Sequence, residues 1–354
     1  MCQVCNTFNE KNKSGQVSDL DQLDFNEHIK RKEDLRIEKE NDKKRAKEDT
    51  AFYVATFDLQ AVLQTPCSNV SQTYYKRKLN SFNLTVFSLG DKKGTCYVWN
   101  ETHGQRGSSE IGTCIITHLS TLPASVKHVV LYSDCCSGQN RNQYLAAGLL
   151  NTVCQHPTVQ IIEQKFLESG YTQMECDSMH AAIEHAQKQT SLFIPEQWDT
   201  IFQMARRQNP YVVVPLRYNN FYDLKTFAGD NFNNFKTVAD GTKVNWLKVK
   251  VLKVQKSQPD KIQVKYNIGD QEFLTINVKR AQRGRPEKAV QVPMKYSTKS
   301  PISVAKKKDL LALCKGFVIP EVYWPYYEGL KTSKDVEDRL PCADVLDAED
   351  TDSN

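Results

Sequence analysis

Short runs of apolar residues, bounded by polar and turn-forming residues, follow a highly charged start of the chain. The runs at 51–59 (AFYVATFDL), 82–89 (FNLTVFSL) and 94–99 (GTCYVW) have the length and the aromatic and β-branched content of buried strands. A tight turn at 90–93 (GDKK) joins the second run to the third and predicts a hairpin. Three strands therefore come first and should form an antiparallel meander.

Helical and strand patterns alternate after the meander. Helices are predicted at 108–119, about 140–153 and about 176–189, and strands at 127–133 (KHVVLYS) and about 159–166. The resulting order is β-β-β-α-β-α-β-α. This order predicts an α/β protein with a ribonuclease H-like mixed sheet, in which right-handed crossovers add parallel strands to the meander and helices flank the sheet.

Two aspartates follow strands that are neighbours in such a sheet. Asp58 lies near the end of the first strand, and Asp134 comes directly after the fourth. Adjacent carboxylates repel one another, but together they hold Mg²⁺ or Mn²⁺ well, because these ions prefer oxygen ligands. We therefore expect a shared metal site. The alternatives are that Asp134 only caps the next helix and that Asp58 faces solvent.

A third ligand is expected from a helix. Asp177, His180 and Glu184 are spaced i, i+3, i+7 and share one helix face. Asp177 is the first choice, with Glu184 next. Glu110, in the first turn of its helix, is a further catalytic candidate, although a negative charge is also favourable there without any catalytic role.

Four segments closely resemble successive blocks of an uncharacterised, transposon-derived protein family of animal genomes: ETHGQRGSSEIGTCI, LYSDCCSGQNRNQY, GYTQMECDSMHAAIE and KKKDLLALCKGFVIPEVYWPYY. The blocks run from about Cys2 to Leu330. The resemblance implies descent from mobile-element proteins, and the fold order with the placement of acids adds the inference of a DDE/D transposase core. Tyr171 stands where relatives tend to have the histidine of Gly-His-Thr, which puts the activity of this copy in question.

The cysteines offer little sign of a disulfide framework. There are eleven of them, irregularly spaced, which is typical of a reducing, intracellular environment. Cys2 and Cys5 form a CxxC without a second pair at zinc-finger spacing. A zinc-stabilised interaction module using Cys135, Cys136, Cys176 and His180 ranks last among the functions considered, because adjacent cysteines rarely ligate one metal together.

Charge is unevenly distributed along the chain. Residues 27–49 mix both signs with few apolar residues and read as a solvated helix or linker. Residues 236–308 hold eighteen Lys and Arg against five Asp and Glu, a balance suited to phosphate backbones, although a solvated strand face is an equal alternative. Lysine alternates with valine or leucine at 244–254, which predicts a small basic β-rich C-terminal module. The expected divisions are 1–50 (charged N-terminal segment), 51–235 (core), 236–300 (basic module and linker), 301–332 (helical segment) and 333–354 (disordered acidic tail).

The same balance identifies candidate nucleic-acid contacts. Arg283-Gly284-Arg285-Pro286 resembles the centre of an AT-hook, whose arginines lie in the A·T minor groove, but it also suits a plain linker. The candidates are Lys248, Lys250, Lys253, Arg280, Arg283, Arg285, Lys306, Lys307 and Lys308.

The preferred hypothesis is therefore a Mg²⁺- or Mn²⁺-dependent nuclease or transposase-like protein acting on DNA. The main alternative is a nucleic-acid-binding protein that has lost the chemistry. Either would act in the nucleus, and a homo-oligomer is allowed. No run of about 18 or more apolar residues marks a membrane span, so no membrane partner is expected.

Overall fold

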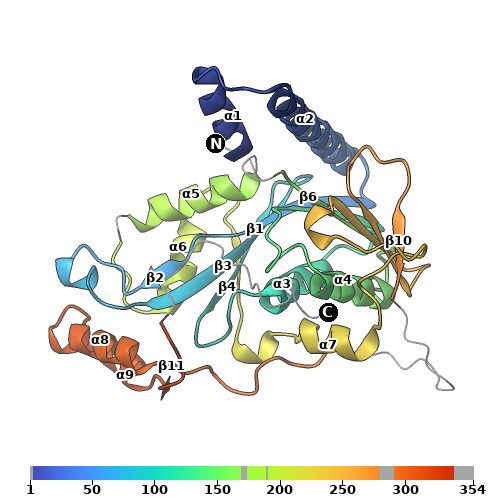
Figure 1. Cartoon of the computed structure of the whole chain (residues 1–354). Helices are drawn as coiled ribbons and strands as arrows, with labels where there is room; N and C mark the ends of the chain where they lie inside the picture. Colours follow the sequence, from blue (N-terminus) through green and yellow to red (C-terminus); the bar gives the residue numbers. More distant parts are fainter. Residues whose placement is uncertain (1–2, 169–173, 189, 279–290, 339–354) are drawn as a thin grey trace.

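The computed structural model describes residues 3–168, 174–188, 190–278 and 291–338, and in this part of the chain one ten-stranded mixed sheet forms the centre (Figure 1). The strands of the sheet are β1 (Phe52–Leu59), β2 (Leu63–Thr65), β3 (Leu79–Ser88), β4 (Gly94–Asn100), β5 (His128–Ser133), β6 (Ile161–Phe166), β7 (Val212–Pro215), β8 (Val251–Gln255), β9 (Lys261–Lys265) and β10 (Leu274–Asn277). Their order is β10-β9-β8-β6-β5-β1-β3-β4-β7, with β2 paired to β3. The predicted α/β class and mixed sheet are confirmed.

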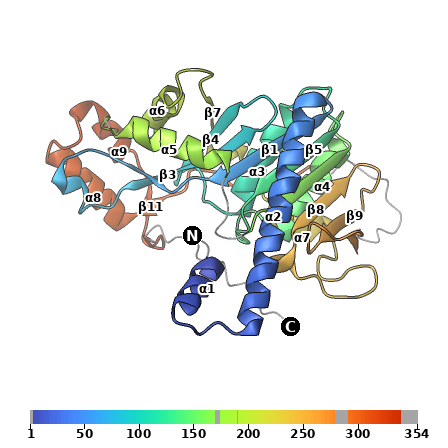
Figure 2. The same cartoon turned by 90° about the horizontal axis from the view of Figure 1, so that it is seen from above.

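Helices lie on both faces of the sheet. The helices of the described part of the chain are α1 (Gln3–Lys13), α2 (Asp19–Glu48), α3 (Ser108–Ser120), α4 (Gln143–Gln155), α5 (Glu175–Gln187), α6 (Trp198–Met204), α7 (Leu224–Asn231), α8 (Val304–Lys315) and α9 (Trp324–Glu328). A further pair of short strands, β11 (Ile302–Ser303) and β12 (Thr332–Ser333), connects the chain before α8 to the chain after α9. The helices α3, α4 and α7 cover one face, and α2 and α5 cover the other (Figures 1 and 2).

The side chains of β1 show why both faces of the sheet must be covered. Ala55 and Phe57 belong to the large core beneath α3 and α4, whereas Val54 belongs to the core beneath α2 and α5. Successive side chains of a strand point to opposite faces, so a strand with no polar alternation needs a packed layer on each side. The same reasoning places Thr56 and Asp58 on the α5 face.

The basic segment does not form a sheet of its own. Strand β8 pairs antiparallel with β6, and β9 and β10 follow it, so the three strands continue the central sheet. Their inward valine, leucine and isoleucine side chains join the core beneath α4. The expectation of a separate small module is corrected for a physical reason: β6 would otherwise expose a row of unpaired backbone groups at a sheet edge.

The charged helix α2 is more than a solvated helix. Its Leu35 is buried in the core over the sheet, its Lys39 pairs with Glu175 of α5 at 2.8 Å, and Lys165 of β6 pairs with Glu38 and Asp42 at 2.6 Å each. Figure 2 shows α2 crossing over the strands. Charges of opposite sign on the sheet therefore hold one side of this helix, which a pattern of alternating charge alone did not indicate.

The predicted acidic tail divides into two parts. Residues 333–338 are described and follow the β11–β12 pair, where the Asp338 carboxylate contacts Ser303 and Arg77. The prediction of disorder from about Asp335 is wrong for this part, because the tail finds cationic and hydroxyl partners there. The rest of the predicted tail lies outside the described residues.

Candidate metal centre

The candidate site lies where β1 ends beneath α5. Asp58 of β1 is paired in register with Thr85 of β3, and α5 packs across both strands. The thiol of Cys176, in the first turn of α5, lies 3.5 Å from the Thr56 hydroxyl. Because Cys176, Met179 and Ile183 are buried, the polar residues between them are placed at the margin of the sheet.

Asp177 and His180 of α5 reach the end of β1 beside Asp58. One ligand atom from each of these three side chains lies within 4.8 Å of the other two. Nδ1 of His180 lies 4.0 Å from Oδ2 of Asp58. Asp177 also accepts a hydrogen bond from the Met174 backbone at 2.9 Å, which caps the helix and fixes the carboxylate beside the site.

Thr85 links His180 to β1. Its hydroxyl lies 3.1 Å from the backbone carbonyl of Asp58, to which it donates, and 2.8 Å from Nε2 of His180. In the tautomer in which the imidazole donates from Nε2 to this hydroxyl, Nδ1 carries a lone pair that faces the Asp58 carboxylate.

Burial keeps the ring neutral. Loss of hydration lowers the pKa of His180 to about 4, so the imidazole is uncharged at neutral pH. An imine lone pair and a carboxylate oxygen that face each other at 4.0 Å repel, and a cation between them removes the repulsion. Ligand atoms around one divalent ion lie roughly 3 to 4 Å apart, since each lies about 2.1 Å from it. The donor set of two carboxylates and one imidazole therefore fits a divalent metal ion.

The histidine bears on the choice of metal. Mg²⁺ prefers oxygen ligands, whereas imidazole suits transition-metal ions and carboxylates suit Mn²⁺ as well. A set of two carboxylates with one imidazole thus favours Mn²⁺ over Mg²⁺. Sequence reasoning placed His180 on the correct helix face but did not select it as a ligand, and it missed Thr85, because a threonine within a strand carries no local signal.

Asp134 follows β5, the parallel neighbour of β1, but it is not one of the three clustered side chains. The parallel pairing of β1 with β5 runs to Thr56 and Tyr132, and Asp58 and Asp134 each come two residues further on the same face. The Asp134 carboxylate accepts hydrogen bonds from the Cys136 backbone N–H at 3.2 Å and from the Asn140 side chain. These bonds hold it in its own loop. The alternative that Asp134 caps the next helix is wrong, because the N-cap of α4 is Asn142.

The remaining acidic candidates lie elsewhere. Glu184 is exposed on α5 and is not one of the three clustered side chains. Glu110 is fully buried at the start of α3, on the opposite face of the sheet. Its carboxylate pairs with Lys295 at 2.8 Å and accepts hydrogen bonds from Tyr296 and from the Gly107 backbone. Glu110 thus anchors a helix start, the second of the two roles expected for it.

The zinc alternative finds no support in the geometry. Across the described ranges, no group of three metal-binding side chains other than Asp58, Asp177 and His180 comes together. The Cys135 thiol donates to the Leu167 carbonyl, and Cys176 is buried against Thr56. Cys2 lies outside the described residues.

The predicted nucleic-acid contacts have different environments. Lys248 and Lys308 are exposed, whereas Lys250 pairs with Glu168 at 2.7 Å and Lys253 with Glu163 at 3.8 Å. Lys306 is 5% exposed and bonded to Glu101, and Lys307 donates to the Glu328 and Leu330 carbonyls. Arg280, Arg283 and Arg285 lie outside the described residues. Sequence balance overstated the free positive charge, because close partners on neighbouring strands and helices neutralise much of it.

Comparisons with models of known protein families, with curated proteins and with solved structures each found no match. Among the helices that the structure describes, none is long and apolar enough to cross a membrane. The arguments about function therefore rest on the geometry of the chain itself.

Proposed function

We propose that this chain is a ribonuclease H-like, transposase-type protein that acts on the phosphodiester bonds of DNA in the nucleus with the help of bound Mn²⁺ or Mg²⁺. The observation that carries the proposal is the convergence of Asp58, Asp177 and His180 at the end of β1. Two carboxylates and a neutral imidazole held together are poorly explained by stability alone, since like charges repel.

The sheet supports the finer fold assignment. Strands β4, β3 and β1 are antiparallel neighbours, and β5 and β6 extend them in parallel. A meander extended by parallel crossovers, with one acidic residue at the end of β1 and another after β5, is what the ribonuclease H assignment expects, and this agreement supports the proposal. In that arrangement the metal site lies where the first and fourth strands of the fold end.

Each side chain has a distinct role in the proposed reaction. A bound divalent ion would lower the pKa of a water or 3′-hydroxyl nucleophile and stabilise the charge on the reacting phosphate. Asp58 and Asp177 would hold that ion by their carboxylates, and His180 by Nδ1. Thr85 orients the imidazole, while the backbone of β1 and the capped start of α5 keep the ligands in place before substrate arrives.

Plasmid cleavage tests the proposal. We expect the chain to nick or linearise supercoiled DNA with MnCl₂, and Asp58→Asn to abolish the cleavage. Asp91→Asn removes a carboxylate from the exposed turn after β3 and serves as the matched control. If Asp58→Asn cleaves as well as the unaltered chain, the activity belongs to another site and the proposal is wrong.

One observation favours the alternative of a non-catalytic DNA-binding protein. The Asp134 carboxylate is bonded to Asn140 and to the Cys136 backbone instead of joining the other three side chains. A chain that binds Mn²⁺ at Asp58 but cleaves no DNA under any metal would support this alternative.

A further inference from the structure

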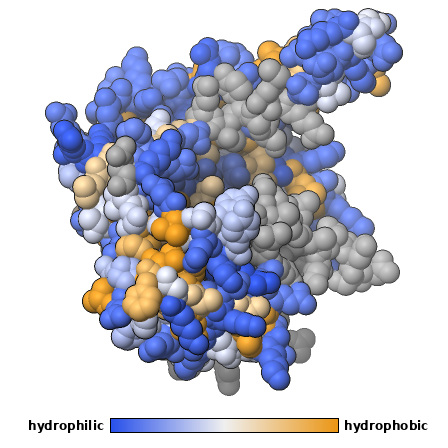
Figure 3. Space-filling model, turned by 90° about the vertical axis from the view of Figure 1, so that its left-hand side faces the viewer, coloured by the Kyte–Doolittle hydropathy of each residue, from blue (hydrophilic) through white to orange (hydrophobic). Residues whose placement is uncertain are grey.

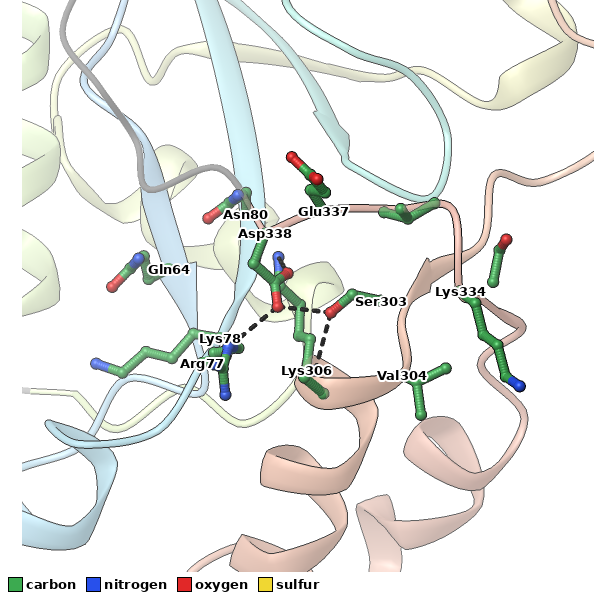
Figure 4. Close-up of a pocket in the computed structure, with 13 residues that line it drawn as sticks. Gln64, Arg77, Lys78, Asn80, Ser303, Val304, Lys306, Lys334, Glu337 and Asp338 are labelled. Atoms are coloured by element: carbon green, nitrogen blue, oxygen red, sulfur yellow. Dashed lines mark hydrogen bonds and ion pairs between the residues drawn. The ribbon is translucent and has the colours of Figure 1, made fainter.

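A pocket of about 720 Å³ lies far along β3 from the metal centre, between the start of β3, the start of α8 and the chain after β12 (Figure 4). Arg77, Ser303 and Lys306 point toward one another there. From Asn80, at this pocket, to Thr85, at the metal centre, β3 advances roughly 17 Å. The pocket is therefore a separate site.

The pocket holds a carboxylate of the chain itself. Asp338 accepts hydrogen bonds or ion pairs from the Ser303 hydroxyl at 2.5 Å, Arg77 Nε at 3.1 Å and Lys306 Nζ at 3.4 Å. We call these three partners, Arg77, Ser303 and Lys306, the anion cradle. The Ser303 hydroxyl accepts from the Lys306 backbone N–H at 3.0 Å, so its proton is directed at the anion.

The fold presents the cradle to an anion independently of Asp338. Ser303 is the N-cap of the twelve-residue helix α8, whose dipole favours negative charge at this end. Lys306 is held by Glu101 at 2.8 Å and Arg77 by Asp309 at 2.8 Å, so each cation has a second partner that positions it without Asp338. A carboxylate occupies only a small part of a pocket of this volume, which has room for a larger anionic group.

Two exposed aromatic residues precede Arg77 of the cradle in the chain. Tyr74 and Tyr75 are each 81% exposed, lie edge to face with ring centroids 5.1 Å apart, and directly precede Lys76, Arg77 and Lys78. Exposed rings beside fixed cations are the elements that bind single-stranded nucleic acid, because bases stack on rings while cations contact phosphates. Figure 3 faces this end of the molecule, where further hydrophobic side chains gather in the lower part of the surface.

We propose that the anion cradle binds a backbone phosphate of single-stranded DNA whose bases stack on Tyr74 and Tyr75, and that Asp338 occupies the cradle in the free protein. The Asp338 carboxylate stands in for the phosphate and competes with it, so the acidic segment after β12 is autoinhibitory. The proposal rests on the proposed function only in naming DNA as the ligand.

Binding of a fluorescein-labelled thymine oligonucleotide to the full chain, measured by anisotropy in EDTA, tests the cradle. Asp338→Asn is expected to raise the affinity about ten-fold, the effect of one charge-assisted hydrogen bond. The slope of log affinity against log salt should steepen by about 0.7, because one more phosphate is contacted. Glu337→Gln removes the same charge from a neighbouring residue that lines the pocket but has no ion pair with the cradle, so it should change both quantities much less.

Two further variants separate the parts of the surface. Arg77→Gln combined with Asp338→Asn should reverse the gain, and a double Tyr74→Ala, Tyr75→Ala variant should lower affinity for the single strand more than for a duplex. Equal gains from Asp338→Asn and Glu337→Gln, or no gain from either, would overturn the proposal. The assay contains no free metal, so its result does not depend on cleavage. If the variants change DNA affinity as expected but the chain does not cleave DNA, only the proposed function is contradicted.

Discussion

Nδ1 of His180 lies 4.0 Å from Oδ2 of Asp58, and Nε2 of the same ring lies 2.8 Å from the Thr85 hydroxyl. The relationship links a strand, its neighbour and a helix that come from distant parts of the sequence. When Nδ1 is unprotonated, its lone pair and the Asp58 carboxylate together suit a metal ion placed between them.

Replacing the imidazole should change metal preference. We expect His180→Gln to weaken Mn²⁺ binding, measured by calorimetric titration, roughly ten- to a hundred-fold and Mg²⁺ binding much less, because only the imidazole nitrogen distinguishes the two ions here. His185→Gln, on the exposed side of the same helix, is the control. Equal losses for both ions would show that His180 is not a ligand.

The third ligand can be assigned by comparing two carboxylates of α5. Asp177 belongs to the cluster and is held by the Met174 backbone, whereas Glu184 is exposed outside it. Asp177→Asn should therefore weaken Mn²⁺ binding at least ten-fold, and Glu184→Gln should leave it nearly unchanged. A titration in which Glu184→Gln abolishes binding and Asp177→Asn does not would exchange the two assignments.

The buried cation on β6 offers a test of how α2 is held. Burial acts to lower the pKa of Lys165, but its ion pairs with Asp42 and Glu38 outweigh this effect and raise the pKa above its ordinary value. Lys165→Met would leave two carboxylates facing one another without a cation, so we expect the free energy of unfolding to fall by about 3 to 5 kcal/mol.

Urea denaturation of Lys165→Met checks this expectation. Lys13→Met, which breaks the exposed pair of Lys13 with Glu10, should leave the midpoint almost unchanged. If the two variants shift the midpoint equally, α2 is not held by the buried pairs.

Local pattern predicted the elements around the centre because each of them is strongly apolar or strongly periodic. The runs that became β1 and β5 have no polar alternation, which only a strand covered on both faces tolerates, and their order placed Asp58 and Asp134 on neighbouring strands. The same pattern does not predict where a side chain points after the strand has ended. Asp134 turns into its own loop because Asn140 lies there, and no spacing rule contains that contact.

The sequence pattern also could not predict contacts between residues that are far apart in the chain. The alternation of lysine with valine in β8 predicted a strand correctly, but its pairing with β6 depends on an edge left open more than eighty residues earlier in the chain. Similarly, Lys306 looked like a freely exposed phosphate ligand in sequence, but the fold buries it and divides its charge between Glu101, directly after β4, and Asp338. Exposed charge can be estimated from sequence only where no partner from elsewhere in the fold intervenes.

A buried histidine far from the metal centre should govern part of the acid stability. His118 of α3 lies between two tyrosines of the sheet, with Nε2 2.7 Å from the Tyr53 hydroxyl and Nδ1 3.1 Å from that of Tyr97. The neutral ring has one donor and one acceptor nitrogen, so it satisfies both hydroxyls. Burial lowers the pKa of His118 to about 4 from its ordinary value of 6.5.

The direction of the pH effect follows from proton binding in the two states. Between pH 6.5 and about 4 the unfolded chain takes up a proton at this residue and the folded chain does not, so the free energy of unfolding falls as the pH is lowered through this window. For His118 alone the loss in the free energy of unfolding approaches about 3 kcal/mol at pH 4.

His118→Gln keeps a donor and an acceptor but does not titrate, so the fall in the free energy of unfolding between pH 7 and pH 4 should be smaller in this variant. Urea denaturation at both pH values measures the difference, with exposed His185→Gln as the control. An identical fall in His118→Gln and in the unaltered chain would show that the acid sensitivity arises elsewhere.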